Sequence, residues 1–297
     1  MKKYIAVAFT GLSLVSSNLY AGLENATSSV ESTIHNPPPV RESATSRDAG
    51  AGRQPALLAS PEAGANAPLR LAKAFLNGEG TEANYQQALQ WFRVAAQNGN
   101  LDAMVYIGDM YRLGKGIAQN YDEALKRYRA TADQGNPLGQ FNLHRMYFSG
   151  YGVLMDKKVA LQWLRKAAEG GLAIAQTRLG KMYKAGMFVQ RDLQEAVKWF
   201  TAAADQGNVE AQFQLAKIYA MGMGGKKDYL QSYVWLQIVM DDCRETAYKQ
   251  QCLDYLSSVS SSLSADQMKK AHQLLSNKRQ HIASAETGEK HGVTIDW

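Results

Sequence analysis

The sequence contains only two cysteines among its 297 residues, and it has neither a CxxC nor an HExxH pattern. Small disulfide-rich domains and cysteine-based zinc sites need more thiols, so both are excluded. A GxSxG nucleophile motif is also absent. The five histidines are scattered without metal-ligand spacing: His35, His144, His272, His281 and His291. We therefore predict no metal, no cofactor and no enzymatic activity.

Charge of one sign is not in large excess either. The chain has 33 Lys and Arg against 27 Asp and Glu, a net charge of +6, with 45% apolar residues. This is the composition of an ordinary globular protein of one or two domains. A nucleic-acid-coating protein is more basic than this, and we predict no nucleic-acid partner.

The N-terminal apolar stretch, residues 4–15, is too short for a bilayer, which needs about 20 helical residues. Two lysines precede it and a more polar segment ending at Ala21 follows it, which is the layout of a secretory signal peptide. We predict that residues 1–21 are removed and that the mature protein is periplasmic or secreted, with no transmembrane span. Leu19 stands where a small residue is preferred, so an uncleaved anchor stays an alternative.

Residues 22–66 are rich in Ser, Ala, Pro, Gly and Asn and include three consecutive prolines, Pro37 to Pro39. Such a segment buries too little apolar surface to offset its ordering entropy, so we expect a disordered tether. Docking of the prolines in a polyproline II groove is the alternative.

From residue 67 to residue 246 the sequence repeats with a period of 36 residues. One column of the alignment holds Trp91, Arg127, Trp163, Trp199 and Trp235. The next column holds Phe92, Tyr128, Leu164, Phe200 and Leu236, and a glycine column holds Gly78, Gly114, Gly150, Gly186 and Gly222. Self-similarity over several columns indicates a repeat array.

Each unit predicts two helices. In helix A, Ala103, Ile107 and Met110 recur at helical spacing before Gly114. Helix B begins at a column of N-cap residues: Asn84, Asn120, Asp156, Asp192 and Asp228. One helix pair cannot bury its apolar face alone, so we expect an all-α, right-handed solenoid of five units, with the tryptophan and aromatic columns between units.

The segments 175–183 and 199–207, together with Gly114-Lys115-Gly116 in the same frame, resemble the Sel1-like repeat, a relative of the tetratricopeptide repeat. The resemblance covers residues 67–246. It implies protein interaction and scaffolding, often in bacterial envelope, secretion or virulence proteins. Two residues depart from the pattern: Arg127 replaces tryptophan, and Phe188 replaces the second loop glycine.

After the repeats we expect a helical cap over residues 247–282 and a flexible tail over residues 283–297. Ser264 and Gln267 form a capping box that predicts a helix from about Ala265 to Gln280. Cys243 and Cys252 are expected to pair in an exported protein, which would stabilise the junction by roughly 2.5 kcal/mol. Two unpaired core cysteines are the alternative.

His144 occupies a column that otherwise holds Ala72, Gly108, Gly180 and Ala216. An imidazole there either packs with one local hydrogen bond or acts as a proton-sensitive wedge, since histidine titrates near neutral pH.

Helical geometry places the columns of residues 105, 106, 109, 112 and 113 on the outward face of helix A. In tetratricopeptide-like stacks this face lines the concave groove. Across the units it holds eight cations and aromatics among them, with Asp109 as its single acid: Arg70, Lys73, Tyr106, Arg112, Phe141, Arg145, Phe148, Arg178, Lys181, Lys184, Phe213 and Lys217. We predict a groove for an acidic or C-terminal-carboxylate peptide, with an ordinary solvated face as the alternative.

The function predicted from the sequence is a noncatalytic protein-binding scaffold in the cell envelope or outside the cell. One alternative is a cell-wall or polysaccharide-associated module of an envelope export, flagellar motor or virulence assembly. Another is a hydrolase acting on a cell-wall or β-lactam substrate, although the sequence has no nucleophile motif for it.

Overall fold

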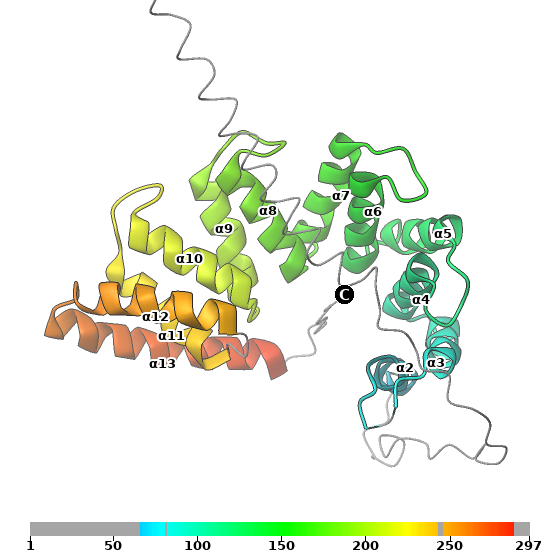
Figure 1. The fold of residues 1–297 in the computed structure, drawn as a ribbon, viewed down its shortest axis with the longest axis horizontal. Helices are drawn as coiled ribbons and strands as arrows, with labels where there is room; N and C mark the ends of the chain where they lie inside the picture. Colours follow the sequence, from blue (N-terminus) through cyan, green and yellow to red (C-terminus); the bar gives the residue numbers. More distant parts are fainter. Residues whose placement is uncertain (1–65, 81, 243–245, 288–297) are drawn as a thin grey trace, which may run out of the picture. The chain divides into compact units, whose positions relative to one another are not determined.

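The structure is a computed structural model, and it describes residues 66–80, 82–242 and 246–287. Within these ranges it has twelve α-helices and no β-strand, all in one compact unit (Figure 1). The helices are α2 (Ala67–Asn77), α3 (Tyr85–Gln97), α4 (Leu101–Leu113), α5 (Tyr121–Ala132), α6 (Pro137–Ser149), α7 (Lys157–Glu169), α8 (Ala173–Ala185), α9 (Leu193–Ala204), α10 (Val209–Met221), α11 (Tyr229–Asp242), α12 (Thr246–Ser260) and α13 (Ala265–Thr287). The predicted signal peptide and nearly all of the tether lie outside the described residues.

The helices from α2 to α11 form five antiparallel-type pairs that recur every 36 residues. In each pair the even-numbered helix is helix A and the odd-numbered helix is helix B. Each helix from α2 to α11 packs against the next helix in the chain (Figure 1). Packing between nearest neighbours is the defining property of a solenoid. The predicted all-α solenoid of five units is therefore confirmed.

Helix B begins where the capping column predicts. Asn84 and Asn120 each accept a bond from the amide three residues on, and Asp156 and Asp192 each accept two amide bonds. Asp228 accepts one such bond, from the amide of Gln231, at the start of α11. Helix A has caps of its own that were not predicted: Asn100, Asn136 and Asn208. Each cap of this kind contributes about 1 kcal/mol to helix stability.

The fully buried column of helix B is the one after the tryptophans. Phe92, Tyr128, Leu164, Phe200 and Leu236 all have 0% of their surface exposed. In contrast, Trp91, Trp163 and Trp199 are only half-buried, and Trp235 alone in that column is buried. The expectation that the tryptophans fill the core between units is therefore wrong for three of the four. One residue along a helix turns the side chain by about 100°, which moves it from the core to its margin.

The small column of helix A lies against this buried column. A Cβ atom added to Gly108 would be 2.7 Å from the Tyr128 ring, and one added to Gly180 would be 2.9 Å from the Phe200 ring. These distances are too short for a side chain unless the facing ring shifts, so glycine fits best at these two positions, whereas the first unit accommodates Ala72 in the same column as well as the buried Phe92. In the third unit the sizes are exchanged, since His144 stands opposite the smaller Leu164 in the same register.

The C-terminal cap consists of α12 and α13, both of which pack on α11 (Figure 1). The capping box is confirmed: the Ser264 amide donates to Gln267 Oε1 at 2.9 Å, and the Gln267 amide donates to Ser264 Oγ at 3.3 Å. Helix α13 continues to Thr287, seven residues beyond the predicted end at Gln280, so the predicted tail begins as helix. No described helix has the length and apolar character that crossing a membrane requires.

The predicted disulfide stays a prediction. Cys243 lies outside the described residues, and Cys252 is buried in α12 within the core that joins the cap to the last unit.

Candidate functional site

Positive charge collects on three consecutive A helices. The sequences of α6, α8 and α10 contain five Lys and Arg residues and a single carboxylate, Glu210. We call these five cations the helix-A basic row: Arg145, Arg178, Lys181, Lys184 and Lys217. All five are half-buried.

The members of the helix-A basic row lie close enough to repel one another. Burial lowers the pKa of Lys184, and the charges of Lys217 and Lys181 lower it further. Burial likewise lowers the pKa of Arg145, and Arg112 on α4 lowers it further. A neighbouring cation lowers the pKa of a lysine or arginine only at short range. Two members contact the next A helix: Lys181 forms an ion pair with Glu210, and the Lys184 ammonium donates to Gln214 Oε1 at 2.6 Å.

Several residues expected on this face are buried instead. Tyr106 is 5% exposed, Phe141 3% and Phe213 2%, and Arg112 is 6% exposed. The expectation that these four side chains point outward is therefore wrong. The wheel of a single helix ignores the neighbours on both sides: the Tyr106 ring stacks on Phe92 of α3 at 4.9 Å. The face that lies open is narrower and more purely basic than predicted.

At the N-terminal end, the two predicted cations on α2 differ in their surroundings. Arg70 is exposed on α2. The ammonium group of Lys73 lies 5.2 Å from the centre of the Tyr106 ring. Burial lowers the pKa of Lys73, although Asp102 opposes this shift.

Arg112 belongs to a buried polar cluster. Its Nη2 and Nε atoms donate to Asp109 Oδ1 at 3.3 and 3.4 Å, and the Tyr128 hydroxyl donates to the same oxygen at 2.8 Å. Burial raises the pKa of Tyr128 well above its usual value, and Asp109 raises it further. Asp109, the single acid predicted on the open face, is thus consumed in holding α4 to α5.

A second cluster lies between α6, α7 and the loop after α8. The guanidinium of Arg178 lies 5.1 Å from the centre of the Phe148 ring, and Lys157 lies 5.8 Å from Phe148 and 5.1 Å from Phe188. The two rings meet edge to face at 6.0 Å. Phe188 is 41% exposed. Of this set, Phe148 and Arg178 were predicted from the sequence as site residues, whereas Lys157 and Phe188 were not expected as their neighbours.

His144 is a buried, hydrogen-bonded core residue. Its ring is 0% exposed, and Nδ1 donates to the backbone carbonyl of Ala160 on α7 at 3.0 Å. Burial lowers the pKa of His144 to about 3, with smaller contributions from Arg178 and Arg145. The histidine is therefore neutral at physiological pH, and a proton-sensitive wedge acting near neutral pH is ruled out.

Five consecutive segments match the sequence profile of the Sel1 repeat: residues 66–100, 101–136, 137–172, 173–208 and 209–238. The chain belongs to the Sel1 repeat family. Sel1 repeat proteins generally mediate protein–protein interactions. A comparison with curated proteins gave no match.

Solved Sel1 repeat structures are similar to this chain. A Sel1 repeat protein from Oxalobacter formigenes has 24% sequence identity and a TM-score of 0.56, over 73% of this chain and 90% of its own. A protective antigen of uropathogenic Escherichia coli has 27% identity and a TM-score of 0.44, over 75% of this chain and 55% of its own. The immunity protein PA5088 from Pseudomonas aeruginosa has 21% identity and a TM-score of 0.48, over 77% and 84% of the two chains. The first of these supports the fold alone.

The two departures from the Sel1 pattern have different structural explanations. Arg127 takes the place of tryptophan by laying its guanidinium on the Tyr111 ring, 5.3 Å from the ring centre. Phe188 keeps the left-handed backbone of the glycine that it replaces, with φ of 59°. A phenylalanine in this region is strained, by about 1–3 kcal/mol.

At the junction that contains Phe188, the residue types of the loop and of the helix that it contacts differ from those of other Sel1 units. In other units the second loop glycine packs on the first residue of the preceding helix B, as Gly116 does on Tyr85 and Gly152 on Tyr121. Between the third and fourth units the aromatic residue moves to the loop, and Lys157 takes the helix position beneath it. The sequence signals this exchange by Phe188 in the loop-glycine column and by Lys157, 31 residues earlier, in the column where the first two units have tyrosine.

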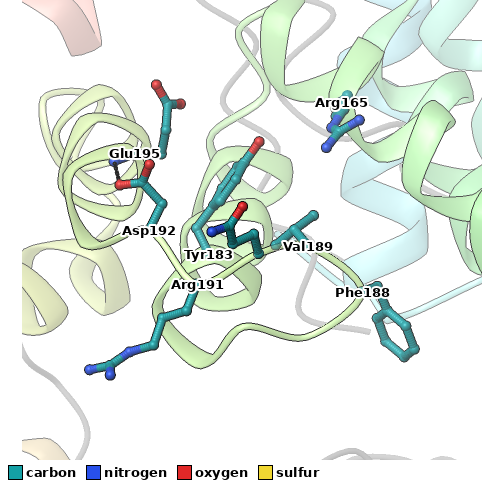
Figure 2. A pocket seen from close by; sticks show the side chains of 8 residues that line it. Arg165, Tyr183, Phe188, Val189, Arg191, Asp192 and Glu195 are labelled. Carbon is teal, nitrogen blue, oxygen red and sulfur yellow. Dashed lines mark hydrogen bonds between the residues drawn. The ribbon is translucent and has the colours of Figure 1, made fainter.

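A shallow pocket of about 430 Å³ lies beside the same loop (Figure 2). Its lining residues are Arg165, Tyr183, Phe188, Val189, Gln190, Arg191, Asp192 and Glu195. Asp192 is occupied in capping α9, as the dashed line to Glu195 shows, and the Arg191 side chain points away from Tyr183 (Figure 2). No group of three or more metal-ligating side chains occurs within the described part of the chain.

Proposed function

We propose that this Sel1 repeat protein is a noncatalytic scaffold that binds an acidic, extended segment of a partner protein on the helix-A basic row. The observation that carries the proposal is the accumulation of five cations and one carboxylate on α6, α8 and α10. Like charges held this close destabilise the surface that carries them. A ligand bearing carboxylates would relieve that repulsion and form charge-assisted hydrogen bonds.

The rest of the molecule supports this choice of surface. The B helices α3, α5, α7, α9 and α11 carry nine Lys and Arg against six Asp and Glu, so the excess of cations is smaller there. The general role of Sel1 repeats in protein interaction agrees with a protein ligand. We place the scaffold in the cell envelope or outside the cell because of the signal-peptide pattern of residues 1–21. The alternatives of a cell-wall module and of a hydrolase stay predictions.

The proposal is tested with the full chain and a fluorescent peptide of about ten residues that contains several glutamates. Fluorescence anisotropy should show binding that weakens as salt shortens the screening length to about 8 Å near 0.15 M. A peptide with glutamine in place of glutamate should bind far more weakly. If the glutamine peptide binds equally well, charge does not drive recognition and the proposal is wrong.

A matched pair of double variants locates the site. Lys184→Glu with Lys217→Glu should weaken peptide binding by about tenfold or more, which is about 1.4 kcal/mol. Lys158→Glu with Lys166→Glu changes the net charge by the same amount on exposed positions of α7 and should have little effect. Equal losses in both double variants would mean that net charge alone matters and that the row is not the site.

A further inference from the structure

The loops that join helix A to helix B within a unit form a continuous row along the stack. A Cβ atom added to Gly116, Gly152 or Gly224 would lie 3.1 Å or less from the first residue of helix B in the preceding unit. Phe188 makes the equivalent contact through its ring, whose centre lies 5.1 Å from Lys157 Nζ. Each of these loops therefore packs on the helix start that follows the preceding loop, so consecutive loops are neighbours in space.

The last three loops hold a cluster of exposed apolar side chains. We define the loop row as residues 150–158, 186–192 and 221–228. Eight large apolar side chains are exposed among the described residues, and four of them belong to the loop row: Leu154 at 92%, Met155 at 59%, Met221 at 48% and Phe188 at 41%. Single exposed apolar residues are ordinary, whereas clusters of them mark sites of interaction.

Exposed cations accompany these apolar side chains. The loop row has four of them: Lys158, Arg191, Lys226 and Lys227. Its only acids in the sequence are three N-caps: Asp156, Asp192 and Asp228. Each of these carboxylates accepts backbone amide bonds at a helix N-terminus, where the positive end of the helix dipole offsets its charge. In the loop after α8, Phe188 and Arg191 extend from the same short segment (Figure 2).

The protruding apolar side chains favour a fluid partner. A leucine with 92% of its surface exposed stands out from the fold, and a protein partner would need a recess shaped to receive it. A lipid layer deforms around such a side chain, and anionic headgroups attract the cations beside it. We propose that the loop row docks the protein peripherally on an anionic membrane surface, with Leu154, Met155 and Phe188 inserted among the lipids. This surface shares no residue with the helix-A basic row, so the proposal does not depend on peptide binding.

Vesicle co-sedimentation with the full chain tests the proposal. The native chain should bind phosphatidylcholine vesicles that contain about 30% phosphatidylglycerol at least about tenfold more tightly than vesicles of phosphatidylcholine alone. Leu154→Ser with Met155→Ser should weaken binding to the anionic vesicles by at least about fivefold, because it removes apolar contact with the lipids and leaves every charge in place. The matched control is Val94→Ser with Leu253→Ser, at exposed apolar positions of α3 and α12, and its binding should stay within about twofold of native.

A second pair of variants tests the cations. Lys226→Gln with Lys227→Gln should weaken binding to the anionic vesicles by at least about fivefold. Lys269→Gln with Lys270→Gln removes two adjacent exposed lysines from α13 and should have a smaller effect. Equal losses in the two lysine pairs would show that net charge alone attracts the protein, and would overturn the loop row as the docking surface.

All variants keep the N-terminal apolar stretch, residues 4–15, so differences between them report on the loops. Undiminished binding of the Leu154→Ser, Met155→Ser variant would overturn the proposal. Failure of the native chain to bind the anionic vesicles would also overturn it, and would indicate a protein as the occupant of the apolar cluster. The Leu154→Ser, Met155→Ser variant should bind the acidic peptide as the native chain does, so failure of membrane docking and failure of the proposed function are distinguishable.

Discussion

Phe200 and Trp199 are adjacent residues on α9 that the structure assigns to different environments. Phe200 is 0% exposed and faces Gly180 so closely that no side chain fits between them, whereas Trp199 is half-buried. Truncating a fully buried phenylalanine costs about 3–5 kcal/mol, because the apolar transfer free energy is lost and a cavity remains. We expect Phe200→Ala to cost that amount and Trp199→Ala about half of it or less.

The assay is urea denaturation followed by far-ultraviolet circular dichroism, which does not depend on the tryptophan that one variant removes. Because repeat arrays do not always unfold in a single step, both variants are compared at the same point of the transition. Gly180→Ala is a third arm: its added Cβ would meet the Phe200 ring at 2.9 Å and should also destabilise the protein. If Trp199→Ala is as damaging as Phe200→Ala, the tryptophan column is the true core and the packing described above is wrong.

Three further predictions concern single sites. His144 has a pKa of about 3 in the folded protein, below the value of about 6.5 in an unfolded chain, so protons bind the unfolded state more readily; the free energy of unfolding should fall by about 2 kcal/mol between pH 7 and pH 5, and urea melts of His144→Ala should show a smaller pH dependence. Phe188→Gly should lose the contacts with Lys157. Adding Lys157→Tyr rebuilds the glycine–tyrosine pair of Gly116 with Tyr85, and the double variant should melt at a higher temperature than Phe188→Gly alone. An equal or lower melting temperature would contradict the exchange. Mass spectrometry of exported protein without reductant should show Cys243 linked to Cys252, and two free thiols would end that prediction.

The elements that the sequence predicts well are those fixed by local chemistry. The cap at Asn84 and the turn at Gly114 each depend on a few adjacent backbone groups, so the residue type alone indicates the structure. The 36-residue period then supplies the order of helices without any long-range information. The end of α13 was missed because residues 281–287 lack a stop signal such as glycine, and helices fray or extend where nothing ends them.

The site was harder to predict because burial on helix A depends on two neighbours at once. A helical wheel for α4 considers only its packing on α5, and it therefore places Arg112 and Tyr106 on the solvent-facing side. In the structure each A helix from α4 to α10 also packs against helix B of the preceding pair, and α4 contacts α6 directly. The charge pattern of α8 survived this correction, because long lysine and arginine side chains reach the surface from partly buried positions.

The pairing of Phe188 with Lys157 makes the five units unequal as building blocks. A repeat array grows and shrinks when whole units are duplicated or deleted, and such events preserve the fold only if each new junction fits. Removing residues 173–208 would bring the glycine loop that begins at Gly222 onto Lys157, which would lose its contact with the Phe188 ring and keep only that with Phe148. The third and fourth units must therefore be exchanged together in any chimera or natural recombination, whereas the junction between the first and second units, where Gly116 packs on Tyr85, accepts a unit of the ordinary type.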